Sequence, residues 1–122
     1  MPRMGRRYKI YQAETGVTYQ YFFEGRRSVV RPEGQGAGSD FAFIVTADQR
    51  PPFVLRIFLS DGALAAWREA HGCDLTPNEQ YAAAKMRLYA AFDAVERLDE
   101  EPFRLVVDGT NVVDLLAPLE LA

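Results

Sequence analysis

Residues 76–98, TPNEQYAAAKMRLYAAFDAVERL, carry the strongest local structural signal in the chain. Thr76 stands at a cap position, Pro77 follows at the first helical position, and Glu79 completes the spacing of a capping box. Apolar side chains then recur three and four residues apart along one helical face, at Tyr81, Ala84, Leu88, Ala91, Val95 and Leu98, with Phe92 widening the stripe. The pattern predicts an amphipathic helix over residues 77–98, about 33 Å long at 1.5 Å per residue.

A second helix is predicted immediately upstream, over residues 61–71. Ser60 and Asp61 form a pair suited to a helix N-cap, and Gly72 is the residue type favoured just past a helix end. Leu64 and Trp67 lie three residues apart, as on one helical face. The acidic second half of the chain is therefore expected to be mostly helical.

The first half of the chain has the pattern of β-structure. The clearest alternation spans residues 17–24, where Tyr19, Tyr21 and Phe23 fall on one face. Gly25 with Arg26 is expected to form a tight turn, and the glycine-rich residues 33–39 a flexible loop. Five N-terminal strands follow from this pattern, at residues 8–13, 17–24, 28–31, 41–47 and 53–59.

The C-terminal segment allows two structures. Residues 103–107 are expected to form a strand, and Asp108 with Gly109 favours a hairpin turn that returns through residues 110–115. Alternatively, Thr110 caps a short helix that runs through Leu116. We favour the hairpin. The predicted fold is then α+β in one domain, residues 1–122: a mainly antiparallel sheet of five N-terminal strands plus a C-terminal strand or hairpin, with two helices packed on one face.

The net charge changes sign at the point in the chain where the predicted secondary structure changes from strands to mostly helices. Residues 1–60 have a net charge of +4, whereas residues 61–122 have a net charge of −7. Clustered positive charge attracts anionic partners such as phosphates. The single cysteine, Cys73, forms no disulfide within the chain, and no apolar run approaches the length of a membrane span. We therefore expect a cytoplasmic protein that does not enter a membrane.

Few residues of this chain suit catalysis. One histidine and one cysteine exclude the common zinc-ligand patterns within a single chain. His71 and Cys73 could meet as base and nucleophile, but they flank Gly72 at a helix end, where a histidine is explained by the nearby carbonyl groups. We therefore favour a protein without catalytic activity, and predict no catalytic residue, no metal site and no cofactor.

Residues 105–113, LVVDGTNVV, resemble the opening motif of the NYN/PIN-like ribonucleases, in which a hydrophobic strand ends in Asp-Gly-x-Asn. The resemblance implies that Asp108 helps to bind a catalytic Mg²⁺ or Mn²⁺, with Asn111 beside it. In that family the motif begins the domain and further acidic ligands follow on later strands. Here only Asp114 and Glu120 follow, so a metal-dependent nuclease ranks third among the functional hypotheses.

The leading hypothesis is a non-catalytic binding or regulatory module that self-associates as a homodimer. Long amphipathic helices with near-heptad spacing can pack on a second copy as well as on their own sheet. The residues predicted for this interface are Tyr81, Leu88, Phe92 and Val95.

The runner-up is single-stranded nucleic-acid binding through the N-terminal strands. Such proteins combine a basic groove with aromatic side chains on which bases stack. The residues predicted for this site are Arg6, Arg7, Tyr19, Tyr21, Arg26, Arg27 and Arg31. An antiparallel sheet with one buried face gives the same alternation, so the exposure of the tyrosines decides between core and site.

Overall fold

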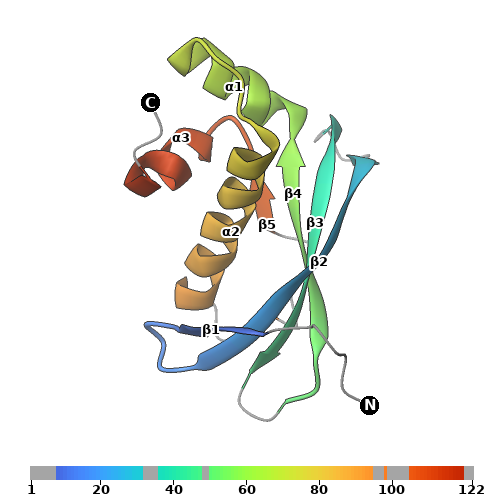
Figure 1. Ribbon diagram of the computed structural model, residues 1–122, viewed down its shortest axis with the longest axis vertical. Helices are drawn as coiled ribbons and strands as arrows, with labels where there is room; N and C mark the ends of the chain where they lie inside the picture. Colours follow the sequence, from blue (N-terminus) through green and yellow to red (C-terminus); the bar gives the residue numbers. More distant parts are fainter. Residues whose placement is uncertain (1–7, 32–35, 48–49, 95–97, 99–104, 120–122) are drawn as a thin grey trace.

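The computed structural model describes residues 8–31, 36–47, 50–94, 98 and 105–119. It contains one five-stranded sheet whose strand order follows the chain (Figure 1). The first four strands pair antiparallel, and the fifth pairs parallel with the fourth. These results confirm the α+β class with a mostly antiparallel sheet. The strands are β1 (Lys9–Gln12), β2 (Thr18–Arg31), β3 (Gly36–Ala47), β4 (Phe53–Ser60) and β5 (Leu105–Val107).

β2 is one long strand where two strands and a turn were predicted. At Gly25 the chain does not turn; a β-bulge shifts the register between Phe23 and Gly25, and pairing with β3 then continues to Arg31. A bulge adds one unpaired residue to a strand without ending it. Gly36 and the three residues after it, predicted as loop, belong to β3 and pair with residues 28–31. Among the described residues, the N-terminal half therefore contributes four strands, not five.

The bulge also decides which face Arg26 occupies. Side chains alternate along a strand, so one extra residue moves every later side chain to the opposite face. Arg26 consequently pairs across from Phe41, on the face that also carries Tyr19 and Phe43. We call this face, which α2 (Pro77–Ala94) covers, the inner face of the sheet, and the opposite face the outer face (Figure 1).

Both predicted helices are present. α1 (Asp61–His71) has the predicted bounds: the Ser60 hydroxyl accepts a hydrogen bond from the Ala63 amide at 3.1 Å, and Gly72 ends the helix with φ 76°. α2 begins with the predicted capping box, in which the Thr76 amide donates to Glu79 at 2.9 Å and the Glu79 amide donates to Thr76 Oγ1 at 3.2 Å. Residues 95–97 of the predicted helix lie outside the described residues.

The helices do not lie on the sheet in the same way. α2 runs along the inner face, whereas α1 continues from the end of β4 and lies at the end of the sheet (Figure 1). The expectation of two helices side by side on one face is therefore met only in part. Among the described helices, none combines the length and the apolar character that crossing a membrane requires.

The C-terminal segment forms a strand and a helix, not the favoured hairpin. After β5 the chain enters α3 (Val112–Leu116) and the 3₁₀ helix η2 (Ala117–Leu119). Asp108 Oδ1 accepts hydrogen bonds from the Thr110 amide at 2.9 Å and the Thr110 hydroxyl at 2.6 Å, which closes the turn locally. Val112 and Leu116 are then fully buried, so the short helix of the alternative is present, although Asn111 and not Thr110 occupies its N-cap position.

The core lies between the inner face and the helices. β2, β3 and β4 contribute alternate residues to it, and α2 covers them with its apolar stripe. Its largest fully buried side chains on the inner face and on α2 are Tyr19, Phe41, Phe43, Leu55, Ile57, Leu59, Leu88 and Phe92. Trp67 of α1 and Leu116 of α3 extend the same cluster.

Candidate anion-binding site

The two tyrosines predicted to stack on bases belong to the core. Tyr19 and Tyr21 are each 2% exposed. The Tyr19 ring stacks on Phe92 with centroids 4.1 Å apart, and the Tyr21 hydroxyl forms a short hydrogen bond with the Tyr89 hydroxyl. This placement corrects the expectation of an exposed stacking surface at these residues. Nucleic-acid binding itself stays a prediction.

The hydroxyl groups around these rings are held in their neutral form. The Tyr11 hydroxyl donates to Asp93 Oδ2 at 2.6 Å, and this hydrogen bond, with burial, raises the pKa of Tyr11 to about 12. Burial, together with the hydrogen bond to Tyr89, raises the pKa of Tyr21 well above its usual value. Both groups therefore stay protonated near neutral pH.

The predicted arginines lie at the other end of β2. Arg26 reaches the start of α2, where its guanidinium donates to Gln80 Oε1 at 2.6 Å and lies 4.8 Å from the centroid of the Phe41 ring. Arg31 donates to Asp40 Oδ1 at 2.7 Å and covers the Phe58 ring on the outer face. Arg6 and Arg7 lie outside the described residues.

Arg27 and Arg56 share the outer face with Arg31. Arg27 is exposed and pairs across from Asp40, while Arg56 is half-buried on β4 across from Ala42. Arg56 was not among the predicted site residues. The sequence could have indicated Arg56, because it is the sole charged residue in β4 and the alternation of side chains places it on the face opposite the core.

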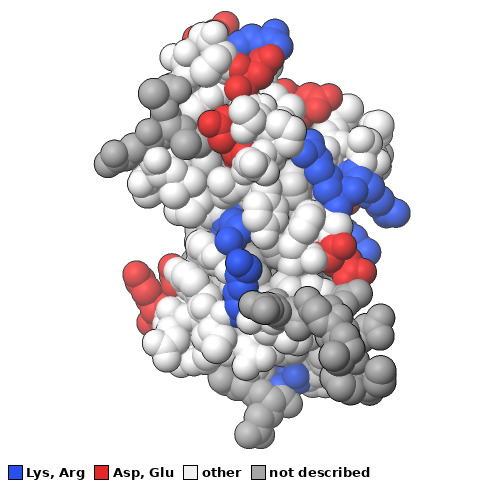
Figure 2. Space-filling view, viewed as in Figure 1, with Lys and Arg blue, Asp and Glu red and all other residues white. Residues whose placement is uncertain are grey.

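These side chains surround a hollow on the outer face, which we call the arginine hollow. Its volume is about 230 Å³, and its lining residues are Glu24, Gly25, Arg26, Arg27, Asp40, Ala42 and Arg56. The lining includes three arginines and two acidic residues, and the guanidinium group of Arg26 itself lies on the inner face, hydrogen-bonded to Gln80. In Figure 2, Lys and Arg side chains gather beside this end of the β2–β3 pair, with acidic side chains at their margin. The arrangement leaves a local excess of positive charge.

A second hollow, which we call the inner hollow, lies on the opposite face of the same strands. It has a volume of about 580 Å³ and is lined by Arg26, Ser28, Val29, Val30, Ala37, Gly38, Ser39 and Asp61. Arg26 lines both hollows, since its strand position is next to the bulge. The two hollows therefore flank one segment of β2 from its two faces.

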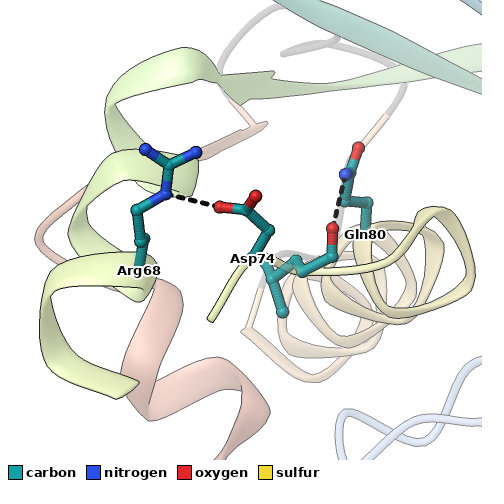
Figure 3. Close-up of polar contacts among 4 residues, drawn as sticks. Arg68, Asp74 and Gln80 are labelled. Carbon is teal, nitrogen blue, oxygen red and sulfur yellow. Dashed lines mark hydrogen bonds and ion pairs between the residues drawn. The ribbon is translucent and has the colours of Figure 1, made fainter. Parts of the chain in front are cut away.

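A third hollow, of about 380 Å³, lies between α1 and the start of α2. Its polar side chains are engaged locally: Arg68 Nε donates to Asp74 Oδ1 at 2.6 Å, and Gln80 Nε2 donates to the Leu75 carbonyl at 3.0 Å (Figure 3). The hydrogen bond raises the pKa of Arg68 and lowers that of Asp74. Because both charges are exposed, this ion pair ties the loop to α1 only weakly.

The side chains predicted for self-association mostly pack against the protein's own sheet. Leu88 and Phe92 are fully buried, and Tyr81 is half-buried against Phe23 and Phe43. Val95 lies outside the described residues. This corrects the assignment of Leu88 and Phe92 to an interface between copies, because neither side chain reaches the surface. The homodimer stays a prediction.

The segment that resembles the nuclease motif has a local structural role. Asn111 Oδ1 accepts from the Asp108 amide at 2.9 Å, and Asn111 Nδ2 donates to the Val106 carbonyl at 3.0 Å. Together with the Asp108–Thr110 bonds, these contacts join β5 to α3. Within the part of the chain that the structure describes, no cluster of three His, Cys, Asp or Glu residues is placed to hold a metal.

The histidine and cysteine considered as a catalytic pair are in different environments. The His71 ring stacks on Trp67 with centroids 3.7 Å apart, whereas Cys73 is exposed. No hydrogen bond joins the two among the described residues.

Comparison with known proteins adds no assignment, since the chain matches no protein-family model, no curated protein and no solved structure.

Proposed function

We propose that the protein is a non-catalytic binding module that recognises an anionic partner at the arginine hollow. The observation that carries this proposal is that Arg27 of β2 and Arg56 of β4 line one hollow on the outer face, with Asp40 of β3 between the two strands. Guanidinium groups suit carboxylate and phosphate oxygens because their planar N–H donors form paired hydrogen bonds.

The guanidinium groups of Arg27 and Arg56 are available for a ligand. Among the described residues, neither Arg27 nor Arg56 has an ion-pair partner, whereas Arg31 is paired with Asp40. Arg56 is half-buried, so a charge-assisted hydrogen bond there is screened less by solvent than at a fully exposed site. A partner that supplies one or two anionic groups at this hollow would balance the local charge.

The charge distribution limits the kind of anion. The whole chain has a net charge of −3, and most of its acidic residues lie in the helical half. A long polyanion would meet repulsion away from β2, so the proposal favours a partner that is anionic over a short stretch. Single-stranded nucleic acid remains the second candidate, supported by the arginines and no longer by Tyr19 and Tyr21. We keep the homodimer and the cytoplasmic location as parts of the proposal.

Fluorescence anisotropy tests the proposal with two labelled probes, a short glutamate-rich peptide and a single-stranded oligonucleotide. The double variant Arg27→Gln with Arg56→Gln should weaken binding about tenfold or more, since each charge-assisted hydrogen bond contributes about 1.5–3 kcal/mol. Arg50→Gln, at an exposed position in the β3–β4 connection, is the matched control and should bind as the parent does. If neither probe binds at low salt, the proposal is wrong.

A further inference from the structure

The inner hollow is floored by small side chains of β3. Residues 36–39, GAGS, were predicted as loop but pair with the end of β2, at the same end of the molecule as α1 (Figure 1). Ala37 and Ser39 lie on the inner face there, and their partners across the strands are Val30 and Ser28. Because these side chains are short, they leave the inner hollow open beside the start of α1.

The Arg26 guanidinium is held in place beside this hollow. It donates to Gln80 Oε1 at 2.6 Å, and Gln80 Nε2 donates in turn to the Leu75 carbonyl at 3.0 Å (Figure 3). Both ends of the Gln80 amide are therefore engaged, which fixes the acceptor that positions Arg26. A guanidinium carries five N–H donors, so donors remain for a ligand. Among the described residues, Arg26 has no ion-pair partner.

Asp61 lies at the junction between the inner hollow and the third hollow, because it lines both. It is the exposed first residue of α1, and it forms no ion pair within the part of the chain that the structure describes. Gln80, which positions Arg26, also lines the third hollow. A cationic and an anionic residue therefore lie beside one junction without pairing with each other.

The third hollow adds apolar surface to this junction. Leu64, Ala65 and Leu75 line it, and its other two charged residues, Arg68 and Asp74, already form an ion pair. The two hollows have volumes of about 580 and 380 Å³. Sites for small molecules typically measure about 300–1,000 Å³ and combine apolar walls with a few polar groups that fix the ligand's orientation. The junction meets this description.

We propose that this junction binds a small zwitterion of the amino-acid type with an apolar side chain. The ligand's carboxylate bonds to Arg26, its ammonium group to Asp61, and its side chain contacts Leu64. A simple anion would leave Asp61 without a partner, and a simple cation would leave Arg26 without one. The site goes beyond the function proposed above, because Arg27 and Arg56 of the arginine hollow lie on the outer face.

The first test is an NMR titration near neutral pH with leucine, leucine methyl ester, which lacks the carboxylate, and isocaproate, which lacks the amine. Leucine should shift the amides of Ser28, Ser39 and Gly62 and leave those of β5 unchanged. Removing either charge should weaken binding about tenfold or more, as expected for the loss of a charge-assisted hydrogen bond. Equal binding of all three compounds, or no shift at the highest soluble concentration of leucine, would overturn the proposal.

Two variants test the role of each charge through a change of preference that loss of folding cannot imitate. Arg26→Gln should bind leucine and its methyl ester about equally, while still preferring both to isocaproate. Asp61→Asn should bind leucine and isocaproate about equally, while still preferring both to the ester. Arg50→Gln and Glu69→Gln, at exposed positions, are the matched controls and should keep the parent's preferences. If Arg26→Gln and Asp61→Asn also keep them, the assignment of the two charges is wrong.

A free amino acid and a short peptide both carry the required pair of charges, and a third titration distinguishes them. Tighter binding of leucine than of the dipeptide leucyl-leucine would assign the site to free amino acids, and the reverse would assign it to short peptides; either result supports a zwitterion site. The same dipeptide with an acetylated N-terminus and an amidated C-terminus has neither charge. If this blocked dipeptide binds as tightly as the free one, the proposal is overturned.

Discussion

The two halves of β2 differ in what their side chains contact. Before the bulge, Tyr19 and Tyr21 are almost fully buried beneath α2. After it, Arg27 is exposed and Val30 is 75% exposed, although the backbone pairs with β3 in the same way. The same strand therefore supports the core at one end and presents exposed side chains at the other. Backbone pairing alone does not decide whether a strand stabilises the protein or presents residues to a partner.

The largest effect that tests this contrast is expected from Phe92→Ala. Phe92 is fully buried and contacts the rings of Tyr19, Tyr21 and Tyr11. Removing a buried aromatic ring typically costs about 3–5 kcal/mol of unfolding free energy. Denaturant unfolding measures this loss, and Val30→Ala, on the exposed half of β2, should change stability by less than about 0.5 kcal/mol. Comparable losses in both variants would remove the distinction between the halves.

A smaller effect is expected from Gly38→Ala in β3. A Cβ atom at Gly38 would press on the Leu59 carbonyl oxygen and lie 2.8 Å from the Phe58 ring. Overpacking of this kind costs about 1–3 kcal/mol, which thermal unfolding detects. Gly25→Ala is the matched control, because nothing lies within 4 Å of a Cβ there. If Gly38→Ala is as stable as the control, the close packing of β3 on Phe58 is refuted.

Arg31→Gln tests the arginine of β2 that we assign to structure through its ion pair with Asp40. Its guanidinium is paired with the buried Asp40, so the variant leaves a carboxylate without its cationic partner. We expect a loss of about 1–3 kcal/mol in chemical denaturation, the usual cost of an unsatisfied buried polar group. Arg27→Gln should cost much less, since Arg27 is exposed. A loss of stability in Arg27→Gln equal to that in Arg31→Gln would contradict this division of roles.

The smallest effect, about 1 kcal/mol near neutral pH, is expected from Tyr11→Phe, which removes the hydrogen bond to Asp93. Folding raises the pKa of Tyr11 from 10 to about 12, so the neutral hydroxyl favours the folded state. This contribution is complete below pH 10 and is lost as the pH rises from 10 to 12. Unfolding free energies measured across that range should therefore fall less steeply in Tyr11→Phe than in the parent protein.

Features that depend on local chemistry were predictable from the sequence. The capping box at Thr76 and the end of α1 at Gly72 were predicted with their correct residues, because caps are formed by neighbours in the chain. The bulge at Gly25 and the parallel pairing of β5 were not predicted. Both depend on strands that are distant in sequence, and a glycine followed by arginines suits a turn as well as a bulge.

The candidate site was predictable only in its charges. Arg26 and Arg27 were predicted for one site, yet they lie on opposite faces of β2, and their role in binding stays a prediction. The alternation that includes Tyr19 and Tyr21 suits a buried face as well as an exposed one. Arg56 lines the arginine hollow because of the register between β3 and β4, which the sequence does not specify. Among the described residues, β1 pairs with β2 only at residues 18–21, and the sequence does not specify this register either.

The parallel pairing of β5 with β4 has a consequence for synthesis of the chain. β4 ends at Ser60, and the strand that covers its second edge begins only at Leu105. At a translation rate of about 5–20 residues per second, this edge waits several seconds for its neighbour. β4 carries Leu55, Ile57, Phe58 and Leu59, an apolar β-prone segment of the type that aggregates when it is exposed. A ribosome that stalls before residue 105 would leave a product prone to aggregation.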